Sequence, residues 1–219
     1  MKNSPSHSYS SLNTHEICPE QYRHVYLLKD FKKSYTPESG AGVDIHRAAE
    51  MRLRYQQPLP DALAKLEPYA ASLERAGKPE CEVSLGVTRD LKPSGFSKGY
   101  LRGKFDVIVR WPEQRRAFIG DWKSGKVRES SDQLEIGALL LMANDETIDW
   151  VTGANIWLQK PGPGTPYKFL RRDKDALWLK WLKRMETVEK DDPAKEWEKR
   201  ESALCGWCPV QSCTYYRGG

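Results

Sequence analysis

FIGDWKSGK, residues 118–126, has the pattern of a strand that ends in a polar turn. Side chains two residues apart in a strand share a face, so Asp121 and Lys123 point the same way while Trp122 faces the other layer. A carboxylate and an ammonium group therefore stand side by side. Phosphodiester hydrolysis can use such a pair, because the carboxylate holds a divalent cation and the lysine orients the attacking water. Most Asp-x-Lys pairs are ordinary exposed strand residues, so whether this pair is catalytic has to be judged from the neighbouring segments.

The strand-like segment before it, GKFDVIV at residues 103–109, carries one acid among apolar residues. Strict alternation places Asp106 on the face opposite Phe105, Val107 and Val109. Two interpretations follow. Asp106 is a second metal ligand beside Asp121, or it lies on the solvated outer face of an antiparallel hairpin.

His46 and Glu50 stand four residues apart in a segment of helical character and so share one helical face. Histidine and glutamate bind metals, or orient the residues that do. A surface hydrogen bond is the commoner role of an isolated pair of this kind. The pair therefore supports a metal site only in combination with Asp106 and Asp121.

Three of the five cysteines, Cys205, Cys208 and Cys213, fall in one short stretch near the C-terminus. The Cys-x-x-Cys spacing lets two sulfurs bind one centre. A fourth ligand is required, and Cys18, which precedes a proline at a loop-helix junction, is favoured over Cys81, whose surroundings suit a small buried hydrophobe. Such a site would join the two ends of the chain. Iron is favoured over zinc, because zinc sites more often use two paired knuckles; unconnected thiols are the remaining alternative.

The order of the expected elements indicates an α/β fold with a mixed sheet between helices. The first third is mostly helical, strands and a buried helix follow, and an amphipathic helix precedes the cysteine stretch. The expected bounds are 9–30, 43–55 and 60–76 for the helical third, 81–87, 103–111, 116–123 and 150–159 for strands, and 132–143 and 173–190 for the later helices.

At 219 residues with 39% apolar and 30% charged residues, the chain suits one soluble domain, residues 1–219. Within it we distinguish a helical N-terminal region (residues 1–78), a catalytic sheet and helix (residues 79–170) and a C-terminal region (residues 171–219). A formal charge of +5 permits DNA as a partner without requiring it. No run is apolar enough to cross a membrane and the polar start lacks the regions of a signal peptide, so we expect a cytoplasmic protein.

Taken in order, these motifs resemble the RecB-like branch of the PD-(D/E)XK nuclease superfamily, especially its members with a four-cysteine iron-sulfur cluster. Those members are CRISPR-associated and phage exonucleases and AddB-like nuclease domains. The matching residues are Gly42, His46 and Glu50 for the first motif, Asp106 for the second, Asp121 and Lys123 for the third, and Gln133 for the glutamine of the following helix. Relatives usually carry a tyrosine shortly after that glutamine, whereas this sequence continues with residues 134–137 as LEIG.

The resemblance implies a restriction-endonuclease-like core and assigns a role to each matching residue. It implies Mg²⁺ or Mn²⁺ held by His46, Asp106, Asp121 and the Trp122 carbonyl. It implies that Lys123 serves the attacking water, and it adds Glu50 and Gln133 to the catalytic residues, with Gln133 helping to place DNA. It implies a [4Fe-4S] cluster, or Zn²⁺ as the alternative, on Cys18, Cys205, Cys208 and Cys213.

The expected function is metal-dependent hydrolysis of DNA, by an exonuclease that favours single strands or DNA ends. The expected setting is CRISPR adaptation, phage recombination or DNA repair, with a protein partner in an adaptation or recombination complex. Two alternatives stay open: a catalytically silent nuclease-like subunit that holds DNA ends, and a zinc-stapled interaction module. Basic residues at 171–172 and 180–184 are candidates to guide DNA, and Trp111 and Tyr100 are candidates to stack on bases.

Overall fold

The structure of the protein, a computed structural model, describes residues 6–31, 37–127, 130–159 and 164–218, and the side chains of all of these except 37–44. Gly42 of the first motif lies within residues 37–44, so its role stays a prediction.

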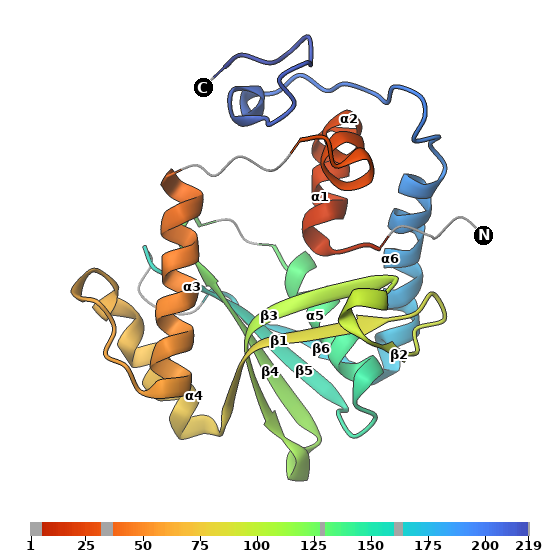
Figure 1. Ribbon diagram of the computed structural model, residues 1–219. Coiled ribbons are helices and arrows are strands. Elements are labelled where there is room, and N and C mark those ends of the chain that lie inside the picture. Colours follow the sequence, from red (N-terminus) through yellow and green to blue (C-terminus); the bar gives the residue numbers. More distant parts are fainter. Residues whose placement is uncertain (1–5, 32–36, 128–129, 160–163, 219) are drawn as a thin grey trace.

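Six strands form one mixed sheet in the order β2-β1-β3-β4-β5-β6 (Figure 1). The strands are β1 (Pro79–Val87), β2 (Pro93–Ser94), β3 (Leu101–Trp111), β4 (Arg116–Lys123), β5 (Trp150–Trp157) and β6 (Tyr167–Leu170). Only β4 and β5 run parallel among these neighbours. A parallel pair needs a crossover, which helix α5 (Asp132–Asn144) supplies.

Helices cover both faces of the sheet (Figure 1). α3 (Pro37–Tyr55) and α4 (Glu67–Ala76), which follows a 3₁₀ turn at Asp61–Leu66, pack on the face that carries Val107, Val109 and Trp122. α5 and α6 (Lys174–Glu189) pack on the face that carries Ile108 and Ile119. Helix α5 is buried from Leu134 through Ala143, which explains why its sequence is apolar on nearly every side.

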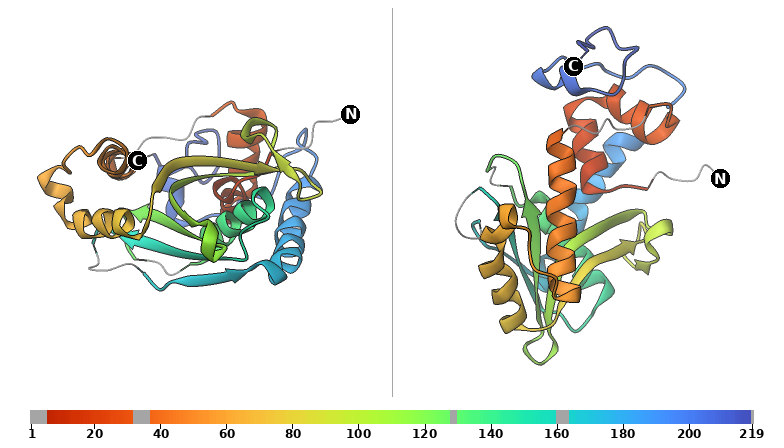
Figure 2. Two further views of the ribbon diagram at one scale, coloured as in Figure 1. Left: turned by 90° about the horizontal axis from the view of Figure 1, so that it is seen from below. Right: turned by 60° about the vertical axis from the view of Figure 1, so that its left-hand side comes forward.

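Helices α1 and α2 and the C-terminal segment lie side by side at one end of the molecule, beyond the strands (Figure 2). The N-terminal segment forms α1 (Tyr9–Ile17), α2 (Pro19–Tyr22) and a π-helical segment (Arg23–Leu28). The Glu20 amide donates to the Glu198 carbonyl at 3.1 Å, and the Arg200 guanidinium donates to the Glu16 carbonyl at 2.8 Å. These bonds hold the C-terminal segment against the first helices.

The expected α/β architecture is confirmed, with most element ends shifted by a few residues. Helix α3 begins earlier than expected, at Pro37, and the short strand β2 and the π-helical segment carried no recognisable sequence signal. Among the described helices, none is long and apolar enough to cross a bilayer.

Phe105 departs from the expected alternation of β3. Its ring packs in the core under α5, whereas Val107 and Val109 pack under α3 and α4. The ladder is interrupted at this point, because Glu82 of β1 has a left-handed φ of 57° and drops out of the pairing between β1 and β3. Gly103 gives the ring room, since a Cβ there would lie 2.4 Å from the Phe105 Cζ atom. Asp106 lies at this interruption, between Phe105 and Val107, whose side chains pack on opposite faces of the sheet.

Candidate active site and cysteine site

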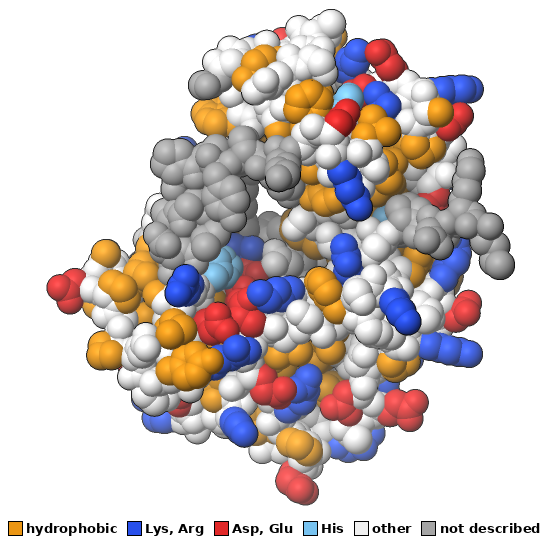
Figure 3. Space-filling view, viewed as in Figure 1, with side chains coloured by type: hydrophobic (Ala, Val, Ile, Leu, Met, Phe, Trp, Pro, Cys, Tyr) orange, Lys and Arg blue, Asp and Glu red, His pale blue; other side chains and the backbone are white. Residues whose placement is uncertain are grey.

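Four elements bring polar side chains to one place beside α3. The side chains are His46 from α3, Asp106 from β3, Asp121 and Lys123 from β4, and Gln133 from α5. The space-filling view shows a histidine with acidic, lysine and arginine side chains gathered in a hollow of this face (Figure 3). Residues far apart in the sequence therefore converge as the motif order predicts.

Gln133 links the acid and the lysine of the third motif. Its amide nitrogen donates to Asp121 Oδ1 at 2.5 Å, and its carbonyl oxygen accepts from Lys123 Nζ at 2.8 Å. Lys123 also forms an ion pair with Asp121. The Asp121 side chain is buried and Lys123 is partly exposed, so the ammonium group borders solvent while the carboxylate is fixed behind it.

Asp106 joins the same constellation from the neighbouring strand. Pairing between β3 and β4 extends only to Val107 and Gly120, which leaves the Trp122 amide to donate to Asp106 Oδ2 at 2.8 Å. The other carboxylate oxygen, Oδ1, lies 2.9 Å from His46 Nδ1. Asp106 therefore faces the site and not the solvated outer side of a hairpin.

The charges of the site perturb one another. Burial raises the pKa of Asp121, the Lys123 ammonium opposes that rise, and the nearby Asp106 carboxylate adds to it. Burial alone would lower the pKa of His46, but the hydrogen bond and charge of Asp106 outweigh it and raise that pKa. Two adjacent carboxylates in a partly desolvated site favour a bound cation.

A cavity of about 570 Å³ opens beside these residues. Its lining includes His46, Glu50, Glu82, Lys104 and Asp106. Glu50 reaches the rim but pairs with Arg54 at 2.7 Å, so its catalytic assignment stays a prediction. Glu82 pairs with Lys104. Lys104 was missed at the sequence level, and the orientation of Glu82 depends on a backbone angle that no sequence pattern marks.

Among the described residues, no three His, Cys, Asp or Glu side chains are grouped closely enough to hold a metal ion as they stand. In this site the carboxylates of Asp106 and Asp121 are engaged by His46 and Lys123 instead. The oxygen and imidazole donors still suit Mg²⁺ or Mn²⁺ chemically. The Trp122 ring is buried and its amide is bonded to Asp106, while the role of its carbonyl stays a prediction.

Gly137 leaves room for the Phe105 ring beside α5. A Cβ at Gly137 would lie 2.9 Å from Phe105 Cε1 and 2.8 Å from Ile119 Cδ1. The Phe105 ring, displaced from its expected face, therefore occupies space next to α5 that a larger side chain at 137 would need.

Several basic and aromatic candidates have structural roles. Arg171 donates to the carbonyls of Met142 in the last turn of α5 and of Asp145 and Ile148 after it, and Lys180 bonds Glu135. Arg184 bonds Glu16 and Asp132. These contacts occupy groups that had been candidates to guide DNA.

The two aromatic candidates to stack on bases are engaged as well. Tyr100 is buried and accepts from Arg89, so its ring is not available for stacking. The Trp111 indole N–H donates to the Ala76 carbonyl, and Arg116 covers its ring.

Four cysteines line one small cavity between the first helices and the C-terminal segment. They are Cys18, at the junction of α1 and α2, and Cys205, Cys208 and Cys213. Burial raises the pKa of the Cys208 thiol, and the other three thiols lie near enough to contribute to the rise. Cys81 lies apart in the core beneath α3 and α4, as expected for a small buried hydrophobe.

Backbone amides support this cysteine site. The Ser202 amide donates to Cys205 Sγ at 3.4 Å, within a 3₁₀ helix at Ala203–Trp207. Four sulfur donors with N–H···S bonds suit either an iron-sulfur cluster or zinc. The thiols share one cavity, although their present separation is wider than metal ligation requires.

Comparison with known proteins agrees with this geometry. Residues 78–213 match the family model of the PD-(D/E)XK nuclease superfamily, a range that holds Asp106, Asp121, Lys123 and Gln133. The fold is similar to that of a solved protein described as "Crystal structure of SSO0001", with a TM-score of 0.51 and 13% identity over 100% of this chain and 90% of that chain. At that identity the likeness shows the fold alone. No curated protein matches the sequence.

The family match spans more than half of the chain and contains the second and third motifs on adjacent strands of the sheet. The chain belongs to the PD-(D/E)XK nuclease superfamily.

Proposed function

We propose that residues 1–219 act as one nuclease domain, a Mg²⁺- or Mn²⁺-dependent deoxyribonuclease of the RecB-like branch. The observation that carries this proposal is the triangle of Asp121, Lys123 and Gln133 beside the pair of Asp106 and His46. We further propose exonuclease action on single strands or DNA ends, in CRISPR adaptation, phage recombination or DNA repair. A protein partner in such a complex belongs to the same proposal.

The residues divide the work by their chemistry. Asp106, Asp121, His46 and the Trp122 carbonyl would hold the cation, which supplies electrophilic assistance to the scissile phosphate and lowers the pKa of a bound water. Gln133 keeps the Lys123 ammonium beside the Asp121 carboxylate. From there Lys123 orients the attacking water and offsets negative charge as it develops on the phosphate.

Lys123→Ala tests the proposal directly. In Mn²⁺ the wild-type chain should cut end-labelled DNA, and the variant should lose about 10²- to 10⁴-fold in rate. Its affinity for DNA in Ca²⁺ should stay within about twofold, because one exposed cation contributes little to binding. Lys126→Ala, an exposed lysine in the loop after β4, is the matched control. Full activity of Lys123→Ala would overturn its assigned role, and an inactive wild-type chain would favour the silent end-binding subunit.

The same assay on circular and linear substrates separates the finer claims. An exonuclease degrades linear single strands from an end and leaves a circle intact. Cutting of the circle would overturn the exonuclease assignment while leaving the nuclease in place.

We also propose that Cys18, Cys205, Cys208 and Cys213 hold a [4Fe-4S] cluster that ties the C-terminal segment to α1 and α2. Anaerobically purified protein should be brown and contain iron, whereas colourless protein with one zinc would overturn the assignment. Cys18→Ala should lose the metal and melt at a lower temperature, because metal binding contributes to folding. Cys81→Ala should keep the metal.

A further inference from the structure

A second cavity, of about 270 Å³, adjoins the catalytic residues on the side of α5. It shares Lys104 with the cavity beside His46, and its lining reaches Gln133 itself. The volume is near the lower end of the range for small-ligand sites, about 300–1,000 Å³. Because Gln133 belongs to the lining, a group bound in this cavity would lie directly beside the proposed position of the reacting phosphate.

The cavity has an aromatic interior. Phe105 and Ile136 are buried and form the floor, while Tyr9 and Phe96 stand at the sides and are partly exposed. The Arg102 guanidinium lies over the Phe96 ring at 5.0 Å from its centroid, a looser contact than the 3.8 Å of Arg116 over Trp111, so Phe96 is less covered than Trp111. Flat, rigid groups of this kind are what a nucleobase stacks on.

The rim is basic and polar. Arg102 and Lys104 are the cations of the lining, and Ser10 and Gln133 add hydrogen-bonding groups. No carboxylate belongs to this lining among the described residues, whereas the neighbouring cavity holds Glu50, Glu82 and Asp106. The cavity beside His46 therefore carries the acids, together with Arg47 and Lys104, whereas this cavity carries aromatic rings and cations and suits a nucleotide.

We infer that this cavity, lined by Tyr9, Phe96, Arg102 and Phe105, is a subsite for one unpaired nucleobase next to the scissile phosphate. The inference rests on the proposed nuclease function and deepens it. A base inside a duplex is already stacked on both faces and cannot enter without being extruded, so the subsite selects single strands or frayed ends. Arg102 would meet a flanking phosphate, whereas Lys104 is held by its ion pair with Glu82.

The test uses the full-length chain, with Ca²⁺ in place of Mn²⁺ so that DNA is bound but not cut. Labelled single-stranded oligonucleotides carry one abasic site, moved a nucleotide at a time along the strand. Wild-type affinity should fall at least about fivefold at one position and little elsewhere, since stacking of one base on an aromatic ring has roughly that effect or more. This measurement needs no substitution in the protein.

Phe96→Ala should bind intact single strands at least about fivefold more weakly and lose the sensitivity to the abasic position, and Phe96→Trp should restore both. Arg102→Ala should also weaken the binding of single strands, because it removes a cation of the lining, and Arg116→Ala is its matched control. It removes an arginine that covers a different aromatic ring, Trp111, at the tip of the hairpin formed by β3 and β4.

Two results would overturn the subsite: equal wild-type affinity for every abasic position, or Phe96→Ala that binds single strands as tightly as wild type. If the wild-type chain still cuts DNA in Mn²⁺, only the subsite fails. If it cuts nothing, the proposed function fails instead.

Discussion

Gln133 is the residue through which α5 contacts both polar side chains of the motif in β4. It forms hydrogen bonds with Asp121 and Lys123 at once, so neither side chain can turn without breaking a hydrogen bond. The motif order predicted that this glutamine lies near the site. Its bridging position could not be predicted, because it depends on how closely α5 packs on the sheet.

Gln133→Leu should keep the size of the side chain and remove both hydrogen bonds. We expect the cleavage rate in Mn²⁺ to fall about 10- to 100-fold, the usual effect of removing a group that orients a metal ligand. Gln114→Leu, which alters a glutamine on the hairpin bonded to Arg116, should cleave as wild type does. An unchanged rate for Gln133→Leu would mean that the bridge has no role in catalysis.

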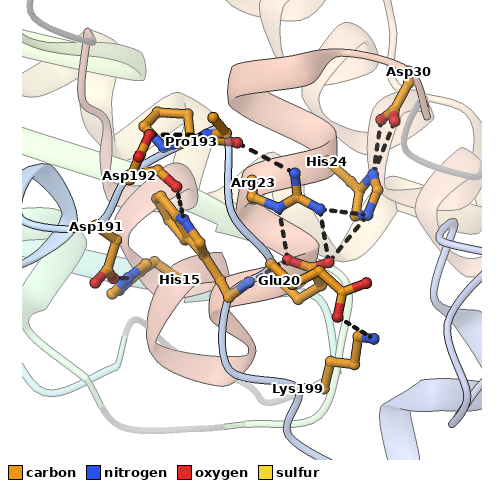
Figure 4. Close-up of polar contacts among 12 residues, drawn as sticks. His15, Glu20, Arg23, His24, Asp30, Asp191, Asp192, Pro193 and Lys199 are labelled. Atoms are coloured by element: carbon orange, nitrogen blue, oxygen red, sulfur yellow. Dashed lines mark hydrogen bonds and ion pairs between the residues drawn. The ribbon is translucent and has the colours of Figure 1, made fainter.

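Glu20 also links two segments of the chain by hydrogen bonds, here the first helices and the C-terminal segment (Figure 4). Its buried carboxylate accepts from Arg23 at 2.7 and 2.9 Å and from the Trp197 amide at 3.0 Å. Burial acts to raise its pKa, but these donors outweigh burial and lower the pKa to about 2. Because the folded chain binds this proton less tightly than the unfolded one, Glu20 stabilises the fold above its ordinary pKa of about 4.3, and that contribution is lost as the pH falls toward 2.

Glu20→Gln should therefore destabilise the protein at pH 7 by about 2–4 kcal/mol, which lowers Tm by several degrees. The difference from wild type should shrink as the pH falls from 5 to 3, since Glu20 of the unfolded wild-type chain takes up a proton in that range and the variant has no carboxyl to protonate there. Thermal melts at several pH values measure this, with the exposed Glu196→Gln as control. A gap that is constant with pH would contradict the role of the charge.

At the scale of elements, local periodicity predicted where strands and helices lie. β4 carries the expected alternation, and α6 buries Trp178 and Trp181 as its amphipathic sequence indicated. The departures occur where tertiary contacts override alternation. Phe105 turns toward α5 because the β1–β3 ladder is broken at Glu82, and a left-handed glutamate has no sequence signature.

Packing between α5 and β3 can be tested at Gly137. Alanine usually stabilises a helix by up to about 1 kcal/mol relative to glycine, but here its Cβ would meet Phe105 and Ile119. Both neighbours are buried, so we expect net destabilisation of about 1–3 kcal/mol from overpacking, measured as a lower Tm. Gly125→Ala, where a Cβ meets nothing within 4 Å, should not destabilise. A raised Tm for Gly137→Ala would show that the Phe105 ring can move aside at little cost, and would contradict the expected overpacking.

At the scale of the whole molecule, the fold places two chemically distinct sites near the two ends of α1. The start of α1 lines the cavity that reaches Gln133, and Cys18, after its end, lines the cavity with the three C-terminal cysteines. Spacing and residue type singled out both sets of residues in the sequence, and their roles as ligands stay predictions. The sequence did not predict that Tyr100 is buried or that Arg171 and Arg184 are bonded within the protein, since such roles depend on the final packing.

The central claim is that segments remote in sequence hold one divalent cation. Titration of the purified protein with Mn²⁺, with the free ion measured by electron paramagnetic resonance, tests it most directly. Asp106→Asn and Asp121→Asn should each weaken Mn²⁺ binding at least about tenfold, because each removes a charged ligand. Asp149→Asn, an exposed carboxylate paired with Arg115, should bind Mn²⁺ as wild type does. Unchanged Mn²⁺ affinity in either active-site variant would contradict the shared site.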